Sequence, residues 1–216
     1  MIIHYKDVAL EGHSDTIAPL TILLSKGEFC LLTGDHDSGI SSLMKSMYGA
    51  HKIISGSAQV LGIQLSTISD NDRAILRRQV GVMLGTQNLI DTITVSDILN
   101  IVLESKGITE NKSQKELSDS ILNQLKISSL SHTLITSLTL LQKQRLSLAM
   151  ALINKPKLLL IYDPLLGQDN TNHELLMDVI FDMASVTKMT TLIVSHDPLL
   201  MKSYPCRTLL MQDLQI

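Results

Sequence analysis

The segment Thr33-Gly-Asp-His-Asp-Ser-Gly-Ile-Ser-Ser42 is central to the fold, because it joins an apolar run to a helical pattern through two glycines, and two hydroxyl residues follow the second glycine after Ile40. The apolar run 29–32 predicts a strand, and residues 41–48 have helical spacing with Gly49 as a C-cap. In such a strand-loop-helix unit, backbone N–H groups and a helix N-terminus can face a phosphate. An ordinary strand-to-helix turn can also contain two glycines, so the rest of the chain must decide between these interpretations.

The loop keeps the backbone of a phosphate site but lacks its cation. A phosphate loop normally adds a lysine that neutralises the terminal phosphate and a hydroxyl that holds Mg²⁺. Ser41 supplies the hydroxyl, whereas Ile40 stands where the lysine is expected. Asp35 and Asp37 place negative charge beside a polyanion site unless they point to solvent. The candidate nucleotide-binding residues are Gly34, Asp35, Asp37, Ser38, Gly39, Ile40, Ser41 and Ser42.

Two further apolar runs predict strands buried on both faces of a largely parallel sheet. Segment 156–163 ends in Asp163, and segment 189–196 ends in His196. Ligands of such sheets bind at the carboxyl ends of the strands, so we expect both side chains to converge with the glycine loop on one edge. The other predicted strands are 17–24, 57–61 and 79–84.

The middle of the chain changes to a helical composition. Segments 95–103 and 117–125 have amphipathic spacing and are linked by the polar segment 104–113. Segment 143–153 predicts another helix. We therefore expect one α/β domain over 1–216, in which 1–87 and 146–216 form the β part and core and 88–145 an inserted helical subdomain.

Composition excludes several classes of function. The 216 residues carry a net charge of -3 and only 3% aromatics, which argues against a nucleic-acid partner. No signal-peptide pattern or membrane-span pattern is present, so we expect a cytosolic protein. Cys30 and Cys206 lie far apart in apolar surroundings, which favours reduced thiols.

Four segments resemble ABC-type ATPases in their order and spacing: 76–84, 138–145, 149–160 and 195–197. The chain is similar, over essentially all its residues, to the short bacterial subfamily that contains the cell-division protein FtsE, with the lipoprotein-release subunit LolD as a neighbour. The resemblance implies a P-loop NTPase fold with a RecA-like core, an N-terminal antiparallel β part and an inserted helical subdomain.

The reactive positions differ from the family pattern. The resemblance places Tyr162 at the Mg²⁺-associated acid and Asp163, followed by Pro164, at the catalytic glutamate. Shifting the register by one residue would restore an aspartate, but the acid-proline pair favours the unshifted register. Gly85 stands where the family has a glutamine that senses metal and γ-phosphate, and Gln87 comes two residues late.

The family's signature, Leu-Ser-Gly-Gly-Gln, corresponds to Leu138, Thr139, Leu140, Leu141 and Gln142. Glycines there let backbone N–H groups approach the γ-phosphate held by the opposite subunit, so we expect the two leucines to prevent that approach, while Thr139 could still donate a hydrogen bond.

The family pattern has three further site positions. Asp169 matches the D-loop acid, and His196 matches the switch histidine, although a strand-end histidine kept for packing or a local hydrogen bond is an equal alternative. The adenine-stacking aromatic has no counterpart, since Gly12 and His13 occupy that region.

The resemblance, taken together with these differences, implies a pseudo-ATPase. We expect it to form a dimer with itself or with a related ABC subunit, and ATP and Mg²⁺ are doubtful as its cofactors. Its partner would be an FtsX-like integral membrane protein, contacted through segment 84–103 on the cytoplasmic face of the inner membrane. Residues of that segment also suit the subdomain's own core. The alternatives are an active ATPase, as in LolD-like or MacB-like export, and a subunit that binds ATP without hydrolysing it.

Overall fold

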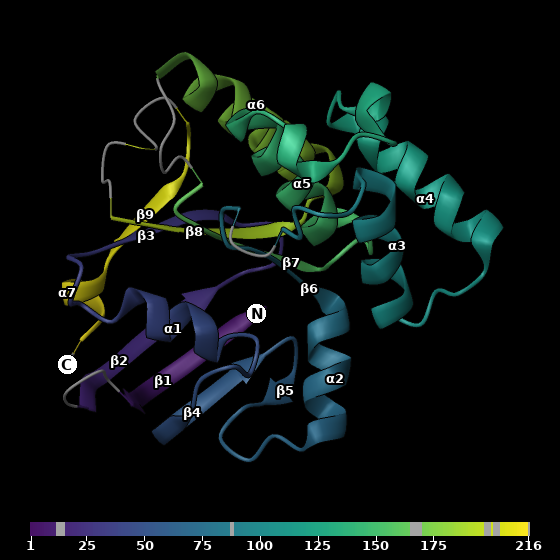
Figure 1. The fold of residues 1–216 in the computed structure, drawn as a ribbon. Helices are drawn as coiled ribbons and strands as arrows, with labels where there is room; N and C mark the ends of the chain where they lie inside the picture. The colour runs from purple at the N-terminus through teal and green to yellow at the C-terminus, as the bar shows by residue number, and fades with distance from the viewer. Residues whose placement is uncertain (12–15, 87–88, 165–169, 197–199, 201–203, 216) are drawn as a thin grey trace.

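The computed structural model describes residues 1–11, 16–86, 89–164, 170–196, 200 and 204–215, which form two sheets and a group of helices (Figure 1). The antiparallel sheet has the order β2-β1-β4-β5, and the parallel sheet has the order β6-β7-β8-β3-β9. Helix α1 lies between the two sheets, while α5 and α6 cover the other face of the parallel sheet (Figure 1). The predicted α/β fold is confirmed.

The strands have the following bounds: β1 Ile3–Glu11, β2 Thr16–Leu24, β3 Phe29–Thr33, β4 Ile53–Val60, β5 Ile63–Gln64, β6 Val80–Met83, β7 Leu158–Tyr162, β8 Thr190–Ser195 and β9 Arg207–Leu210. The α-helices are α1 Ile40–Ser46, α2 Asp70–Gln79, α3 Val95–Ser105, α4 Asn111–Gln124, α5 Leu140–Leu152, α6 Asn170–Thr187 and α7 Met211–Leu214, and two 3₁₀ turns are η1 Ser128–Leu130 and η2 Ile135–Ser137. No helix among the described residues is long and apolar enough to cross a membrane.

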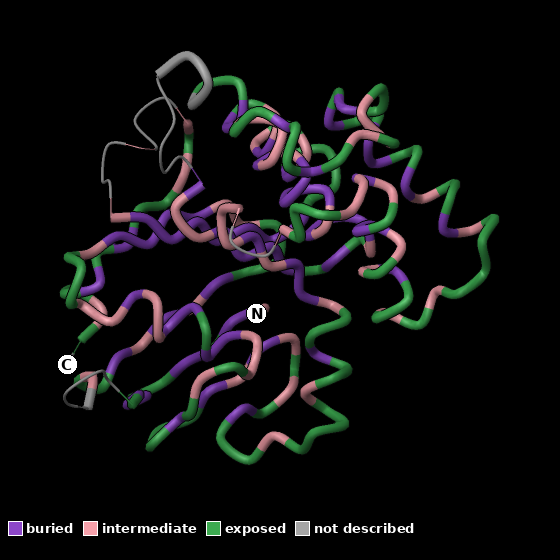
Figure 2. The backbone as a smooth tube through the Cα atoms, in the orientation of Figure 1, coloured by how far each residue is buried: buried purple, intermediate pink, exposed green. Residues whose placement is uncertain are grey.

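The parallel sheet separates two apolar cores. In β7, Leu158 and Leu160 face the core shared with α1 and the antiparallel sheet, whereas Leu159 and Ile161 face the core under α3, α4, α5 and α6. Successive side chains of a strand point to opposite faces, so a strand covered on both sides is apolar at every position. Figure 2 shows this burial along the strands.

The same alternation separates the two cysteines. Cys30 is buried in the core between the sheets, and Cys206 packs against the core on the helical side. Both thiols are free, as expected, and burial raises the pKa of Cys30 to about 12. The two thiols therefore lie on opposite faces of the parallel sheet.

Several elements differ from the sequence prediction. Strand β4 begins at Ile53 rather than at residue 57, and α4 begins at Asn111 rather than at 117. Elements β1, α2, α6 and β9 were not predicted. The proposed subdomain 88–145 contains α3, α4 and both 3₁₀ turns, and its boundary, which falls inside α5, stays a prediction.

We expect Gly56→Ala to destabilise the fold more than Gly107→Ala. Both glycines have left-handed φ angles, +84° and +88°, but a Cβ at Gly56 would lie 2.1 Å from the carbonyl oxygen of Asp7, while nothing lies within 4 Å of one at Gly107. Both variants carry the same penalty for a left-handed φ, so that penalty cancels in the comparison. The clash between β1 and β4 should lower the free energy of unfolding of Gly56→Ala by about 2 kcal/mol more than that of Gly107→Ala. Urea denaturation measures the free energy of unfolding of both variants, and an equal decrease in the two would contradict the close contact at Gly56.

Candidate functional site

The carboxyl ends of β3, β7 and β8 bring the predicted residues together. Thr33 pairs with Ser195, and Tyr162 pairs with Val194, so the three strands end side by side. The Nδ1 atom of His196 lies 2.9 Å from the carbonyl oxygen of Gly34, and the Ser195 hydroxyl donates to Asp163 Oδ1 at 2.8 Å. The expected convergence of Asp163, His196 and the glycine loop is confirmed.

The loop between β3 and α1 is held by its own hydrogen bonds. The backbone N–H of Ser38 donates to the carbonyl oxygen of Asp35 at 3.0 Å, and the Ser38 hydroxyl donates to the same oxygen at 2.6 Å. Gly39 then enters α1 with φ +85°, which favours glycine. A Cβ at Gly34 would lie 2.7 Å from Ser38 Oγ and 2.9 Å from Met211 Cβ. Any side chain at Gly34 would therefore collide with the loop and with α7.

A hollow of about 180 Å³, the carboxyl-edge hollow, lies against this loop. Its lining residues are Thr33, Gly34, Asp35, Ser38, His196, Leu210, Met211 and Gln212. No lysine or arginine of the described chain lines it, and Lys45, one turn into α1, is exposed and outside it. Asp35 and Asp37 are exposed, which reduces the charge penalty that the sequence suggested.

Ile40 is part of the core rather than of the loop surface. Its side chain is only 1% exposed and packs in the core between the two sheets. Ser41 and Ser42 are partly exposed on the first turn of α1. The position expected for a lysine therefore contributes apolar packing.

Tyr162 faces two of the predicted site residues. Its hydroxyl lies 3.1 Å from Nε2 of His196, and the Ser41 side chain is also its hydrogen-bond partner. Burial, helped by nearby Asp163, raises the pKa of the Tyr162 phenol against the opposing effect of Ser41, so the phenol is neutral. A carbonyl oxygen only accepts, so His196 Nδ1 donates to Gly34, and in the neutral ring Nε2 accepts from Tyr162.

Asp163 is directed toward the end of β8. Its Oδ1 accepts hydrogen bonds from the Ser195 hydroxyl and, at 3.2 Å, from the backbone N–H of His196, while Oδ2 lies 4.0 Å from His196 Nε2. The residue has a φ of +39°, which is uncommon outside glycine. One oxygen of the predicted base thus has two protein donors.

His36 also belongs to the site, although it was not predicted from the sequence. Its ring stacks on that of His196 with centroids 4.1 Å apart and an interplanar angle of 27°. The available signal was a histidine inside the glycine loop, four residues before Ile40, but the spacing alone does not reveal a stack with a ring 160 residues later.

The signature-like segment forms the N-terminus of α5. The Thr139 hydroxyl accepts from the Gln142 backbone N–H, and the Gln142 side chain accepts from the Thr139 N–H, which makes a capping box. Leu141 packs against the core, whereas Leu140 is 38% exposed. Both leucines were expected to prevent the close approach of a γ-phosphate; Leu140 is exposed and could do so, whereas Leu141 packs against the core.

Gly85 follows β6 with φ +59°, and no atom lies within 4 Å of the point that a Cβ would occupy there. A Cβ would therefore meet no neighbouring atom, but the left-handed φ would strain a glutamine at this position. Asp169, Gln87, Gly12 and His13, which the family resemblance also singled out, lie outside the described residues.

A family model described as "ABC transporter" matches residues 17–165, which include the glycine loop, the signature-like segment and Asp163. The chain belongs to the ABC transporter family. Its fold is that of the family's nucleotide-binding domain: a dimeric structure of MJ0796, a bacterial ABC transporter cassette, aligns with a TM-score of 0.80 at 21% identity, covering 92% of this chain and 89% of that one.

The curated relatives include both short and long proteins. The lipoprotein-releasing system ATP-binding protein LolD of Buchnera aphidicola is 30% identical, over 88% of this chain and 83% of LolD. A Vibrio parahaemolyticus protein named as an ABC transporter ATP-binding protein, VPA1482, is 28% identical over 94% of this chain. The chain spans about a third (34%) of that relative's length.

The described residues do not fit the magnesium nucleotide that the family implies. A neutral phenol faces Ser41 where an acid is needed for Mg²⁺, and the carboxyl-edge hollow offers no described lysine or arginine for a phosphate.

We expect Ile40→Lys to lower the free energy of unfolding by more than about 2 kcal/mol, because an ammonium would be buried in an apolar core. Ile40→Val, which keeps the site apolar, should cost about 1 kcal/mol. Urea denaturation compares the two. A lysine variant as stable as the wild type would mean that this side chain reaches solvent at the loop.

Proposed function

We propose that the protein is an FtsE-like subunit that docks a membrane partner and turns over ATP poorly or not at all. The observation that carries the proposal is the Tyr162 hydroxyl, which faces both Ser41 and His196. A magnesium ion there would meet an uncharged group instead of a carboxylate.

Charge at the site supports the same proposal. A nucleotide brings several negative charges, and Asp35 and Asp37 add two more beside the loop. Asp163 is one methylene shorter than glutamate, and its Oδ1 already accepts two hydrogen bonds, so it is poorly placed to orient an attacking water.

Formation of a dimer does not restore a complete nucleotide site. Composite sites of this kind need a phosphate loop from one subunit and a signature from the other. Here both halves have changed, with Ile40 buried in the core and Leu140 exposed at the start of α5. The chain would therefore dimerise, with itself or with a related subunit, for assembly rather than for hydrolysis.

We expect no saturable stabilisation of the purified protein by millimolar Mg-ATP in a thermal-shift titration. A ligand that binds only the native state must raise apparent stability, by about 2.7 kcal/mol at a hundredfold excess over Kd. The Buchnera LolD protein, tested in parallel, controls for the assay.

Two results would count against this part of the proposal. Saturable stabilisation without turnover would favour a subunit that binds ATP and does not hydrolyse it. Turnover that disappears in Asp163→Asn, a substitution suited to the positive φ, would favour an active export-type ATPase, the function that the relationship to LolD supports.

The proposed docking surface is the segment after β6 together with α3. Val95, Ile98, Leu99 and Leu103 are buried and belong to the subdomain's own core, as the alternative interpretation expected. Two apolar side chains of the segment project to solvent: Ile90 is 47% and Ile101 is 48% exposed. These two are available to an apolar helix of an FtsX-like protein on the cytoplasmic face of the inner membrane.

We expect Ile90→Asp with Ile101→Asp to abolish co-purification with the FtsX-like partner, while Val186→Asp, at an 84% exposed position on α6, leaves it intact. All three positions are exposed, so stability should change little. Tyr162→Phe should also retain the partner. Loss of co-purification in the Val186→Asp control, or retention of the partner by the double variant, would contradict docking through this surface.

A further inference from the structure

A second, larger hollow lies at the opposite edge of the parallel sheet. This amino-edge hollow has a volume of about 820 Å³ and lies where α5 turns into β7, where α6 turns into β8 and where β2 turns into β3. Helix α4 contributes one face, with Leu117, Ser120, Ile121 and Gln124 at helical spacing. The volume is in the range of small-molecule sites, which measure about 300–1,000 Å³.

The interior of the amino-edge hollow is apolar. Aliphatic and thioether side chains from three helices and the following turns line it: Leu117, Ile121, Leu152, Ile153, Met183 and Met189. Ile121, Leu152 and Met183 also touch the helical-side core, so the lining is anchored in packed structure. Methionines adapt their shape readily to an apolar occupant.

The rim is basic. Lys26, Lys155, Lys157 and Lys188 line the hollow, and no aspartate or glutamate is among its described lining residues. Lys157 donates to the Gln79 side chain at 2.7 Å, and within the described chain none of the four forms an ion pair.

Strand pairing brings these lysines to one place. Leu158 pairs with Thr190, so the turns carrying Lys157 and Lys188 lie at the start of neighbouring strands. The backbone N–H of Gly27 donates to the Thr190 hydroxyl at 2.9 Å, which holds Lys26 beside the same strand end. A lysine that follows a helix also interacts favourably with the partial negative charge of the carbonyl groups at the C-terminus of that helix. This role alone does not explain why an apolar hollow lies between the lysines.

We propose that the amino-edge hollow binds a monomeric amphipathic anion with a long apolar tail and one acidic head, of the fatty-acid class. The tail would fill the space between α4 and the ends of α5 and α6, and the head would lie among the exposed lysines. Four cations without an opposing carboxylate complement such a head, and the volume of about 820 Å³ with its apolar lining suits a single apolar chain.

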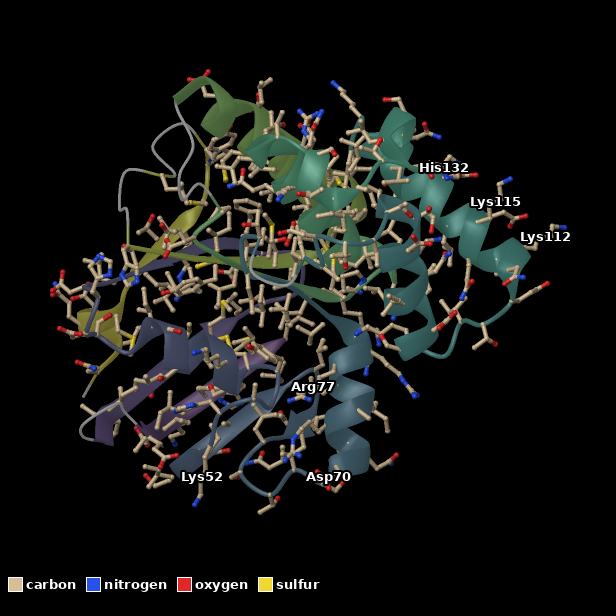
Figure 3. All side chains as sticks on the ribbon, viewed as in Figure 1. Lys52, Asp70, Arg77, Lys112, Lys115 and His132 are labelled. Atoms are coloured by element: carbon tan, nitrogen blue, oxygen red, sulfur yellow. The ribbon has the colours of Figure 1, made fainter. Side chains whose placement is uncertain are left out.

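The test uses the full chain and oleate below its micelle-forming concentration, measured by calorimetry. The variant Lys155→Asn with Lys188→Asn removes two cations, and asparagine tolerates their φ angles of +49° and +51°. Its matched control, Lys112→Asn with Lys115→Asn, removes two cations at the outer edge of α4 (Figure 3). We expect saturable binding that weakens about tenfold or more in the first variant and is unchanged in the control.

Three further measurements separate the contribution of the apolar tail from that of the acidic head. Oleyl alcohol should bind more weakly than oleate, and acetate should not bind. Ser120→Trp, at an exposed position that lines the hollow, should block oleate by filling the tail space. Absence of oleate binding to the wild type, equal weakening in both lysine variants, or binding only to phosphatidylglycerol vesicles would overturn the proposal.

Discussion

Burial of the parallel sheet on both faces is the constraint from which the remaining structure follows. Alternate side chains of β3, β7 and β8 fill two separate cores, so neither face of these strands can hold a polar site. Polar chemistry is left to the strand ends. The carboxyl edge has the glycine loop, Asp163 and His196, and the amino edge has the lysines.

Several polar side chains of the carboxyl edge bind one another or the backbone beside them. His196 Nδ1 donates to the loop carbonyl of Gly34 and its Nε2 lies 3.1 Å from the Tyr162 hydroxyl, while Asp163 accepts from Ser195 and from the backbone of His196. In a nucleotide site the corresponding groups face a ligand and a metal ion. The loop keeps its turn and its left-handed Gly39, so the backbone of the family is retained around side chains that bind one another.

The sequence predicted those elements whose pattern is set by burial alone. Strands β3, β7 and β8 and their convergence follow from the apolar runs 29–32, 156–163 and 189–196, the last two of which end in Asp163 and His196. Strand β1 was missed because charged residues on its exposed side and a bulge near Asp7 break the alternation. Helix α2 was missed because Leu76 is its one buried residue, so its pattern is polar throughout.

Contacts between distant side chains could not be read from spacing. Nothing in the sequence indicates that Tyr162 meets Ser41, that His36 stacks on His196, or that Leu140 and Leu141 point to different sides. The contacts among these side chains have a consequence for the evolution of the chain. Tyr162 and Asp163 both contact His196, so a substitution at either residue changes the surroundings of the histidine that they share. We therefore expect sequence changes at this sheet edge to be coupled to one another, while the buried strands preserve the ABC fold.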